Sequence, residues 1–224
     1  CDTTSVNLHK VLHAALSLKP GRNKVIAEAD CFPSDLYVLE GVKSLHPDLE
    51  ILLEGRDGSS IHEMLDEQVA AVLINHVDYR SGTLRDMENL TRQVQEFGGL
   101  AVWDLSHSVG IFPVQLNRCR VDFAVGCTYK YLNGGPGAPA YLYAASRHHA
   151  ACNQPLSGWF GHARPFDFER HFDPDSGIRR FVCGTQPILS LRALQSGLVI
   201  YQDVSLQQVR EKSMALTNLF IKLL

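Results

Sequence analysis

The stretch that decides the fold is VAAVLI at residues 69–74, a run of apolar residues with no polar alternation. Such a run is typical of a parallel β-strand that helices cover on both faces. Segments with helical spacing follow Thr3 and cover residues 34–45, 61–65 and 87–97. They alternate with further strand-like segments, so we predict an α/β fold with a mainly parallel sheet flanked by helices. The further strand-like segments are residues 24–29, 49–53, 100–103, 123–127 and 140–144.

The sequence also predicts where the first helices begin and which later segments are loops or helices. The polar cluster Asp2-Thr3-Thr4 is expected to begin the first helix, and Ser34 or Asp35 the second. Residues 146–184 are rich in His, Arg, Pro and aromatic residues and have little periodicity, which predicts functional loops. From residue 186 the apolar spacing becomes helical again and predicts a long helical segment to the end.

Charge and hydropathy exclude several classes of protein. The 224 residues are 45% apolar and carry a formal net charge of -3. A nucleic-acid-binding domain normally has a basic excess, so no nucleic-acid partner is predicted. No apolar run approaches the roughly 20 residues that span a bilayer, so no membrane partner is predicted either.

The six cysteines form no CxxC pair and no zinc-type spacing, so we predict reduced thiols, a cytoplasmic protein and no metal site. The chain opens with CDTTSVNLHK, which has neither an initiator Met nor the apolar core of a signal peptide. It closes on LTNLFIKLL, with no polar tail. These ends lead us to expect a fragment.

Two residues that follow predicted strands carry the chemistry. Ligands of parallel sheets bind at the carboxyl ends of the strands. Asp104 closes the segment AVWD, with His107 three residues later, and Lys130 lies in GCTYKYLNGGPG. Taken singly, Asp104 is explained better as a cap of the next turn. Lys130 could be a snorkelling lysine beside a turn, but Gly134, Gly135 and Gly137 weaken that interpretation because they let the backbone approach a ligand. Because Lys130 is the lysine flanked by apolar and aromatic residues, we predict that it is buried, with a depressed pKa suited to a nucleophile.

Together these residues predict pyridoxal phosphate. This cofactor needs a lysine amine for covalent attachment and a carboxylate beside its pyridine nitrogen. Its phosphate needs a polar cradle, which hydroxyls at the start of a helix supply. The segment from Asp2 to Ser5 offers such a cradle.

At this point the chain resembles a known family, the kynureninases. The resemblance is carried by CDTTSVNL, CFPSDLY, VWDLSHSVG, GCTYKYLNGGPG, QPLSGWFGHARPF and CGTQPILSL, in colinear order. It implies the large domain of a fold-type I pyridoxal phosphate enzyme, which cleaves L-kynurenine to anthranilate and L-alanine in tryptophan catabolism. The substrate 3-hydroxykynurenine stays open.

The resemblance also implies roles for individual residues. Lys130 would bind the cofactor covalently, Asp104 would pair with the pyridine nitrogen near His107, and Tyr129 would be a catalytic acid that also contacts the phosphate. Thr3 and Thr4 would bind the phosphate. The walls of the cofactor site would be Phe32, Pro33, Ser34 and Asp35. Trp159 and Thr185 would reach the phosphate region of a neighbouring subunit, which predicts a homodimer with shared active sites.

Relatives of this kind are longer at both ends. We therefore expect residues 1–185 to be a partial cofactor-binding domain, and residues 186–224 to be a helical connector toward a missing small domain. Two other functions stay open: a cysteine desulfurase or selenocysteine lyase, and a truncated, non-catalytic cofactor-binding module. Two interpretations are minor: the pair His9 and His13 is expected to be a solvated helix face, and Asn75, His76 and Tyr79 are expected to be pocket walls.

Overall fold

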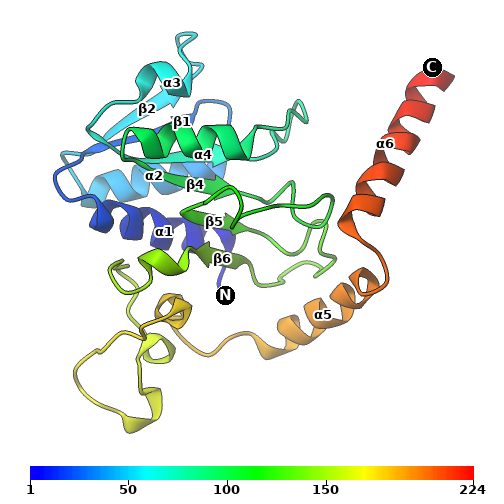
Figure 1. Cartoon of the computed structure of the whole chain (residues 1–224). Coiled ribbons are helices and arrows are strands. Elements are labelled where there is room, and N and C mark those ends of the chain that lie inside the picture. Colours follow the sequence, from blue (N-terminus) through cyan, green and yellow to red (C-terminus); the bar gives the residue numbers. More distant parts are fainter.

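A computed structural model describes all 224 residues and has a six-stranded sheet at its centre, with strand order β2-β1-β3-β4-β5-β6 (Figure 1). Strands β1 to β5 run parallel to their neighbours, and β6 is antiparallel to β5. The predicted α/β fold with a mainly parallel sheet is confirmed. The strands are β1 (Lys24–Glu28), β2 (Glu50–Glu54), β3 (Val69–Asn75), β4 (Leu100–Asp104), β5 (Phe123–Gly126) and β6 (Tyr141–Ala144).

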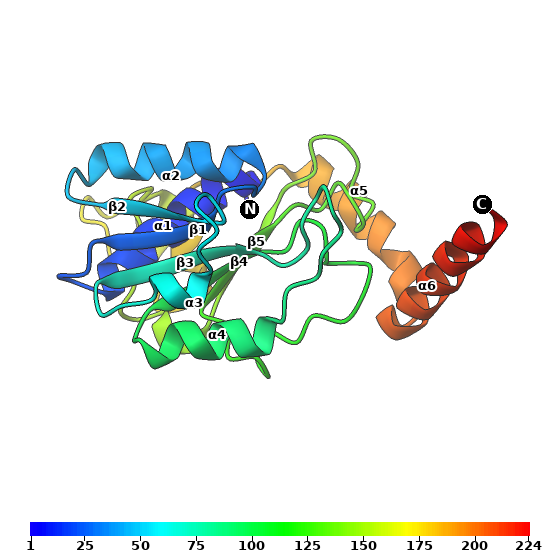
Figure 2. The same ribbon diagram turned by 90° about the horizontal axis from the view of Figure 1, so that it is seen from above.

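Helices cover both faces of this sheet, as Figure 2 shows. Helices α1 (Thr4–Leu18) and α2 (Pro33–Leu45) cover one face, and α3 (Ile61–Met64) and α4 (Met87–Glu96) cover the other. All residues of β3 are buried, which explains the uninterrupted apolar run. Because the side chains of a strand alternate between its faces, the same run supplies apolar contacts to two separate cores.

Helices α1 and α2 begin in different ways. Thr3 is the N-cap of α1, and its hydroxyl accepts from the backbone N–H of Val6, as predicted. Helix α2 begins at Pro33 after Phe32, which makes no side-chain cap bond. The predicted cap at Ser34 or Asp35 is therefore wrong. The fixed φ of proline suits the first helical position, and this places Asp35 inside the first turn.

After β6 the chain has little regular structure until residue 188. Residues 146–184 contain only short 3₁₀ turns between loops, as predicted. The predicted long helical segment is interrupted, because α5 (Ile188–Leu198) and α6 (Leu206–Leu223) are separate helices. A new capping box at Ser205 starts the second one. Neither helix has a buried residue, and both extend away from the body (Figure 1). No helix combines the length and the apolar character required to cross a membrane.

Candidate active site

A cavity of about 290 Å³ lies at the carboxyl ends of the parallel strands and gathers most of the predicted site residues. They come from the start of α1, the start of α2, the turn after β4 and the loop after β5. The sequence analysis overlooked Ser106, whose only signal is its place two residues after Asp104. The lining is Thr3, Thr4, Ser5, Phe32, Ser34, Asp35, Asp104, Ser106, His107, Tyr129 and Lys130.

Lys130 presents its amine to this cavity. Its Nζ lies 2.8 Å from Nε2 of His107 and within 6 Å of two ring centroids, at 5.6 Å from that of Phe32 and 5.8 Å from that of Tyr129. Burial and the charge of Lys130 lower the pKa of His107. A neutral imidazole has one acceptor nitrogen, and Nε2 serves as the acceptor for Nζ of Lys130 when the ring proton is on Nδ1. His107 thereby orients the amine.

Asp104 lies beside two further polar side chains. It is 5% exposed, and its Oδ1 accepts from the backbone N–H of Ser106 at 2.7 Å. Parallel register places Asn75 of β3 directly beside it. The amide of Asn75 donates to Oδ2 of Asp35 at 3.2 Å. Burial, followed by the negative charge of Asp104, raises the pKa of Asp35 to about 8. The site thus contains two neighbouring carboxyl groups, of which Asp35 tends to keep its proton.

This pair leads to a prediction about the cofactor-free chain. The unfolded chain releases the Asp35 proton near the ordinary pKa of 3.8, whereas the folded chain keeps it until about pH 8. The free energy of unfolding therefore falls as pH rises between these values. The Asp35→Asn side chain can still donate a hydrogen bond to Asp104, but it has no proton to lose, so this loss of stability with rising pH does not occur. We expect it to stabilise the cofactor-free chain at pH 8 by about 3 kcal/mol and to change little below pH 4.

Urea denaturation at the two pH values measures this effect. Asp48→Asn is the matched control, because Asp48 is exposed and lies beyond the C-terminal end of α2, whereas Asp35 lies in the first turn of this helix. A stabilisation by Asp35→Asn that is equal at both pH values would contradict the raised pKa.

The start of α1 forms a polar cradle beside Lys130. The first turn of a helix leaves backbone N–H groups without intrahelical acceptors, and its dipole favours anions. The hydroxyls of Thr3 and Thr4 line the same surface, as does the half-exposed phenol of Tyr129. These three residues also line an adjoining cavity of about 440 Å³. A phosphate group fits this cradle in both charge and position.

Taken together, the residues fit pyridoxal phosphate. The cavity offers one lysine amine, one buried carboxylate and a hydroxyl-lined helix start, which are the groups that this cofactor requires. Aromatic rings stand around the amine: Tyr79 packs edge-on against Phe32 at 5.3 Å and stacks on His107 at 6.4 Å.

Three predicted site residues lie outside this cavity. Pro33 starts α2 and does not line it. Trp159 is 42% exposed and packs against Phe160 and Phe166, and Thr185 is exposed. Both lie on the surface of this chain, so their role toward a neighbouring subunit stays a prediction.

Two expectations about burial are wrong. Lys130 is only partly buried, whereas Lys10 on α1 is the lysine with no exposed side-chain surface. The side chain of His76 is buried away from the cavity, against Trp103 and Phe112, so it is no pocket wall.

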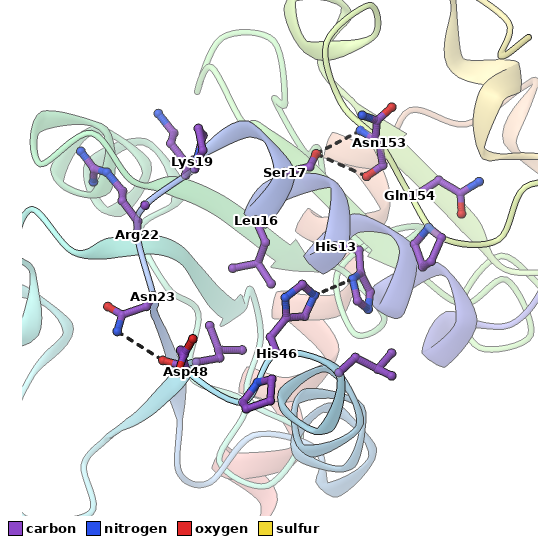
Figure 3. A pocket seen from close by; sticks show the side chains of 16 residues that line it. His13, Leu16, Ser17, Lys19, Arg22, Asn23, His46, Asp48, Asn153 and Gln154 are labelled. Atoms are coloured by element: carbon purple, nitrogen blue, oxygen red, sulfur yellow. Dashed lines mark hydrogen bonds between the residues drawn. The ribbon is translucent and has the colours of Figure 1, made fainter.

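A separate cavity of about 550 Å³ lies at the opposite end of α1 and α2 (Figure 3). Here Nε2 of His46 lies 3.1 Å from Nδ1 of His13, and the ring of His9 packs against that of His13. The interpretation of His9 and His13 as a solvated face is thus wrong, because His13 is partly covered by His46. No three metal-ligating side chains in the structure are placed to hold a metal ion.

Comparison with known proteins agrees with the fold and with the cofactor. The aminotransferase class-V family model matches residues 3–224. The chain therefore belongs to the class-V aminotransferase family, whose members use pyridoxal phosphate. A solved cysteine desulfurase from Escherichia coli superposes with a TM-score of 0.78 at 16% identity, and the match covers 96% of this chain and 55% of that one. At this identity the likeness concerns the fold alone.

Within the family, the chain is similar to kynureninases. It is 45% identical to the kynureninase of Burkholderia mallei (strain SAVP1), with 99% of this chain and 54% of the relative covered. It is 43% identical to the kynureninase of Pseudomonas fluorescens, again with 99% and 54% covered. The chain thus spans about half the length of these curated relatives. The resemblance seen in the sequence motifs is confirmed.

Proposed function

We propose that the chain provides the cofactor site of a hydrolase that cleaves the Cβ–Cγ bond of L-kynurenine and releases anthranilate and L-alanine. The observation that carries this proposal is the cavity in which Lys130, Asp104 and the start of α1 meet, in a chain 45% identical to a kynureninase. Tryptophan catabolism, and through it NAD biosynthesis, is the proposed context. The closely related 3-hydroxykynurenine is a second substrate of the same chemistry.

The residues then have defined tasks. Bound pyridoxal phosphate supplies an electron sink for the pair left at the substrate α-carbon. Nζ of Lys130 moves the proton from that carbon, and the neutral imidazole of His107 orients Nζ through the 2.8 Å contact. The carboxylate of Asp104 holds a proton on the pyridine nitrogen. Water supplies the hydroxyl that the γ-carbonyl carbon gains when the Cβ–Cγ bond breaks, and Oη of Tyr129 would donate the proton that Cβ gains.

The remaining residues bind and orient. Thr3, Thr4 and the first-turn N–H groups of α1 hold the phosphate dianion at the positive end of the helix dipole. The ring of Phe32 would cover the cofactor, and Ser34 and Asp35 would complete the wall. A wall of this kind keeps the cofactor oriented so that only one face of the substrate meets Lys130.

The assembly is also part of the proposal. Residues 1–185 act as the cofactor-binding domain, and residues 186–224 connect it to further structure. The absence of buried residues in α5 and α6 supports this division. The exposed Trp159 and Thr185 support a homodimer in which each subunit contributes to the phosphate site of the other. The proposed location is the cytoplasm, which agrees with six free cysteines.

The desulfurase alternative is disfavoured by the position of its best candidate sulfur. Such an enzyme needs an accessible cysteine on a mobile loop, and Cys152, the open candidate, is fully buried. Burial also raises the pKa of its thiol. A non-catalytic module would bind the cofactor but turn over no substrate.

Two assays separate these outcomes. The 224-residue chain is titrated with pyridoxal phosphate and followed by its visible absorbance. The complete polypeptide that its gene encodes is then assayed for anthranilate fluorescence with kynurenine and for sulfide with cysteine. We expect a cofactor-dependent absorbance change and anthranilate release. Sulfide release without anthranilate would overturn the proposal, and cofactor binding without either product would favour a binding module.

A further inference from the structure

Lys10 is a buried cation with two well-defined partners. Its side chain is completely buried on α1, and its Nζ donates to Oδ2 of Asp2 at 2.6 Å and to the backbone carbonyl of Phe181 at 2.7 Å. A charge buried in this way is costly unless its partners are held in good geometry. One partner, Asp2, lies near the start of the chain, and the other, Phe181, lies 171 residues after Lys10. The cation therefore ties together two segments that are far apart in sequence.

The first partner controls the turn that precedes the phosphate cradle. Asp2 has φ of 48°, in the left-handed region that residues other than glycine rarely adopt. Its backbone carbonyl accepts from the N–H of Ala140, and the backbone nitrogen of Cys1 donates to the carbonyl of Ala140. The ion pair between Lys10 and the carboxylate of Asp2 fixes the side chain of Asp2 as well, and so stabilises this conformation. Thr3, the N-cap of α1, follows directly, so the direction of its hydroxyl depends on the turn at Asp2.

The second partner belongs to the segment that carries Thr185. Phe181 is 1% exposed and ends a 3₁₀ turn four residues before Thr185. This segment packs closely against the loop that carries Trp159. The approach is so close that a side chain at Gly158 would collide with the Cys183 carbonyl. Lys10 thus contacts the turn before Thr3 and Thr4, which are predicted to bind the phosphate of this chain, and the segment of Thr185, which is predicted to reach the phosphate of a neighbouring subunit.

We propose that Lys10 is a positioning residue for the phosphate of the cofactor. Through Asp2 it sets the turn that aims Thr3 and Thr4 at the cavity, and through the Phe181 carbonyl it fixes the segment leading to Thr185. This proposal rests on the proposed function, since it requires that pyridoxal phosphate binds with its phosphate at the start of α1. It predicts that loss of Lys10 weakens recognition of the phosphate and spares recognition of the ring.

Comparison of two ligands isolates this effect. The chain and its Lys10→Met variant are titrated with pyridoxal phosphate and with pyridoxal, which has the same ring and aldehyde but no phosphate. We expect Lys10→Met to lower the affinity for pyridoxal phosphate by roughly tenfold and to leave that for pyridoxal within about twofold. Lys24→Met is the matched control: it also removes a 2.6 Å ion pair, with Asp66, at the amino end of β1, which is the end of the strand opposite the cavity.

The remaining outcomes are also decisive. Equal losses for both ligands, or no loss for either, would overturn the positioning role. If Lys10→Met does not fold, Asp2→Asn decides, because asparagine tolerates the left-handed conformation but lacks the charge. The same selective loss, in smaller degree, is then expected. A wild-type chain that does not prefer pyridoxal phosphate over pyridoxal would instead contradict the proposed function.

Discussion

Replacement of Lys130 by alanine is expected to abolish covalent attachment of pyridoxal phosphate and to lower kynurenine cleavage by roughly 10⁴-fold. Lys130 is the lysine that lines the cavity, and its Nζ is oriented by His107. No neighbouring side chain can replace its amine. Borohydride reduction of the wild-type chain with its cofactor, followed by peptide mass spectrometry, should find the added mass on Lys130.

Two further variants separate the amine from its charge. Lys130→Arg keeps a cation beside His107 but cannot form the covalent link, so we expect it to fail as alanine does. Lys24→Ala removes a lysine outside the site and should change neither attachment nor turnover. Cofactor mass found on the buried Lys10, or retained by Lys130→Ala, would contradict the assignment.

The fold could be predicted because its pattern is local. Seven consecutive buried residues in β3 need apolar side chains on both faces, and a sequence records this directly. The polar residues at the strand ends were predictable for a related reason. Neighbouring parallel strands end at the same edge, so Asp104 and the loop with Lys130 meet there.

The parts that could not be predicted depend on contacts between distant segments. Lys10 lies in a helix with ordinary apolar spacing, and its burial follows from Asp2 and the Phe181 carbonyl. The raised pKa of Asp35 comes from burial and from the charge of Asp104, and the start of α2 meets that residue only at the carboxyl ends of β3 and β4. Neither relation leaves a signal in local composition. The start of α2 differs from the prediction because Pro33 occupies the first helical position after Phe32, which caps the helix without a side-chain hydrogen bond, so the rule of a polar cap does not apply.

Asp104→Asn is expected to retain the cofactor but to lower turnover by roughly 10³-fold. The amide is nearly isosteric and can still accept from the Ser106 N–H, so the local geometry is kept. It has no negative charge with which to hold a proton on the pyridine nitrogen, so the electron sink is weakened. Nitrogen NMR of isotopically labelled cofactor measures this directly, and we expect the nitrogen to be protonated in the wild type and unprotonated in the variant.

Unfolding cannot account for such a loss. Asp104 and Asp35 repel each other in the cofactor-free chain, so neutralising either should stabilise it near pH 8. The variant is thus expected to be less active and yet more stable, a combination that a damaged fold would not produce. Asp30→Asn, which removes an exposed carboxylate paired with Arg80, should change neither property. If Asp104→Asn keeps the pyridine nitrogen protonated, the carboxylate has a different task and the assignment fails.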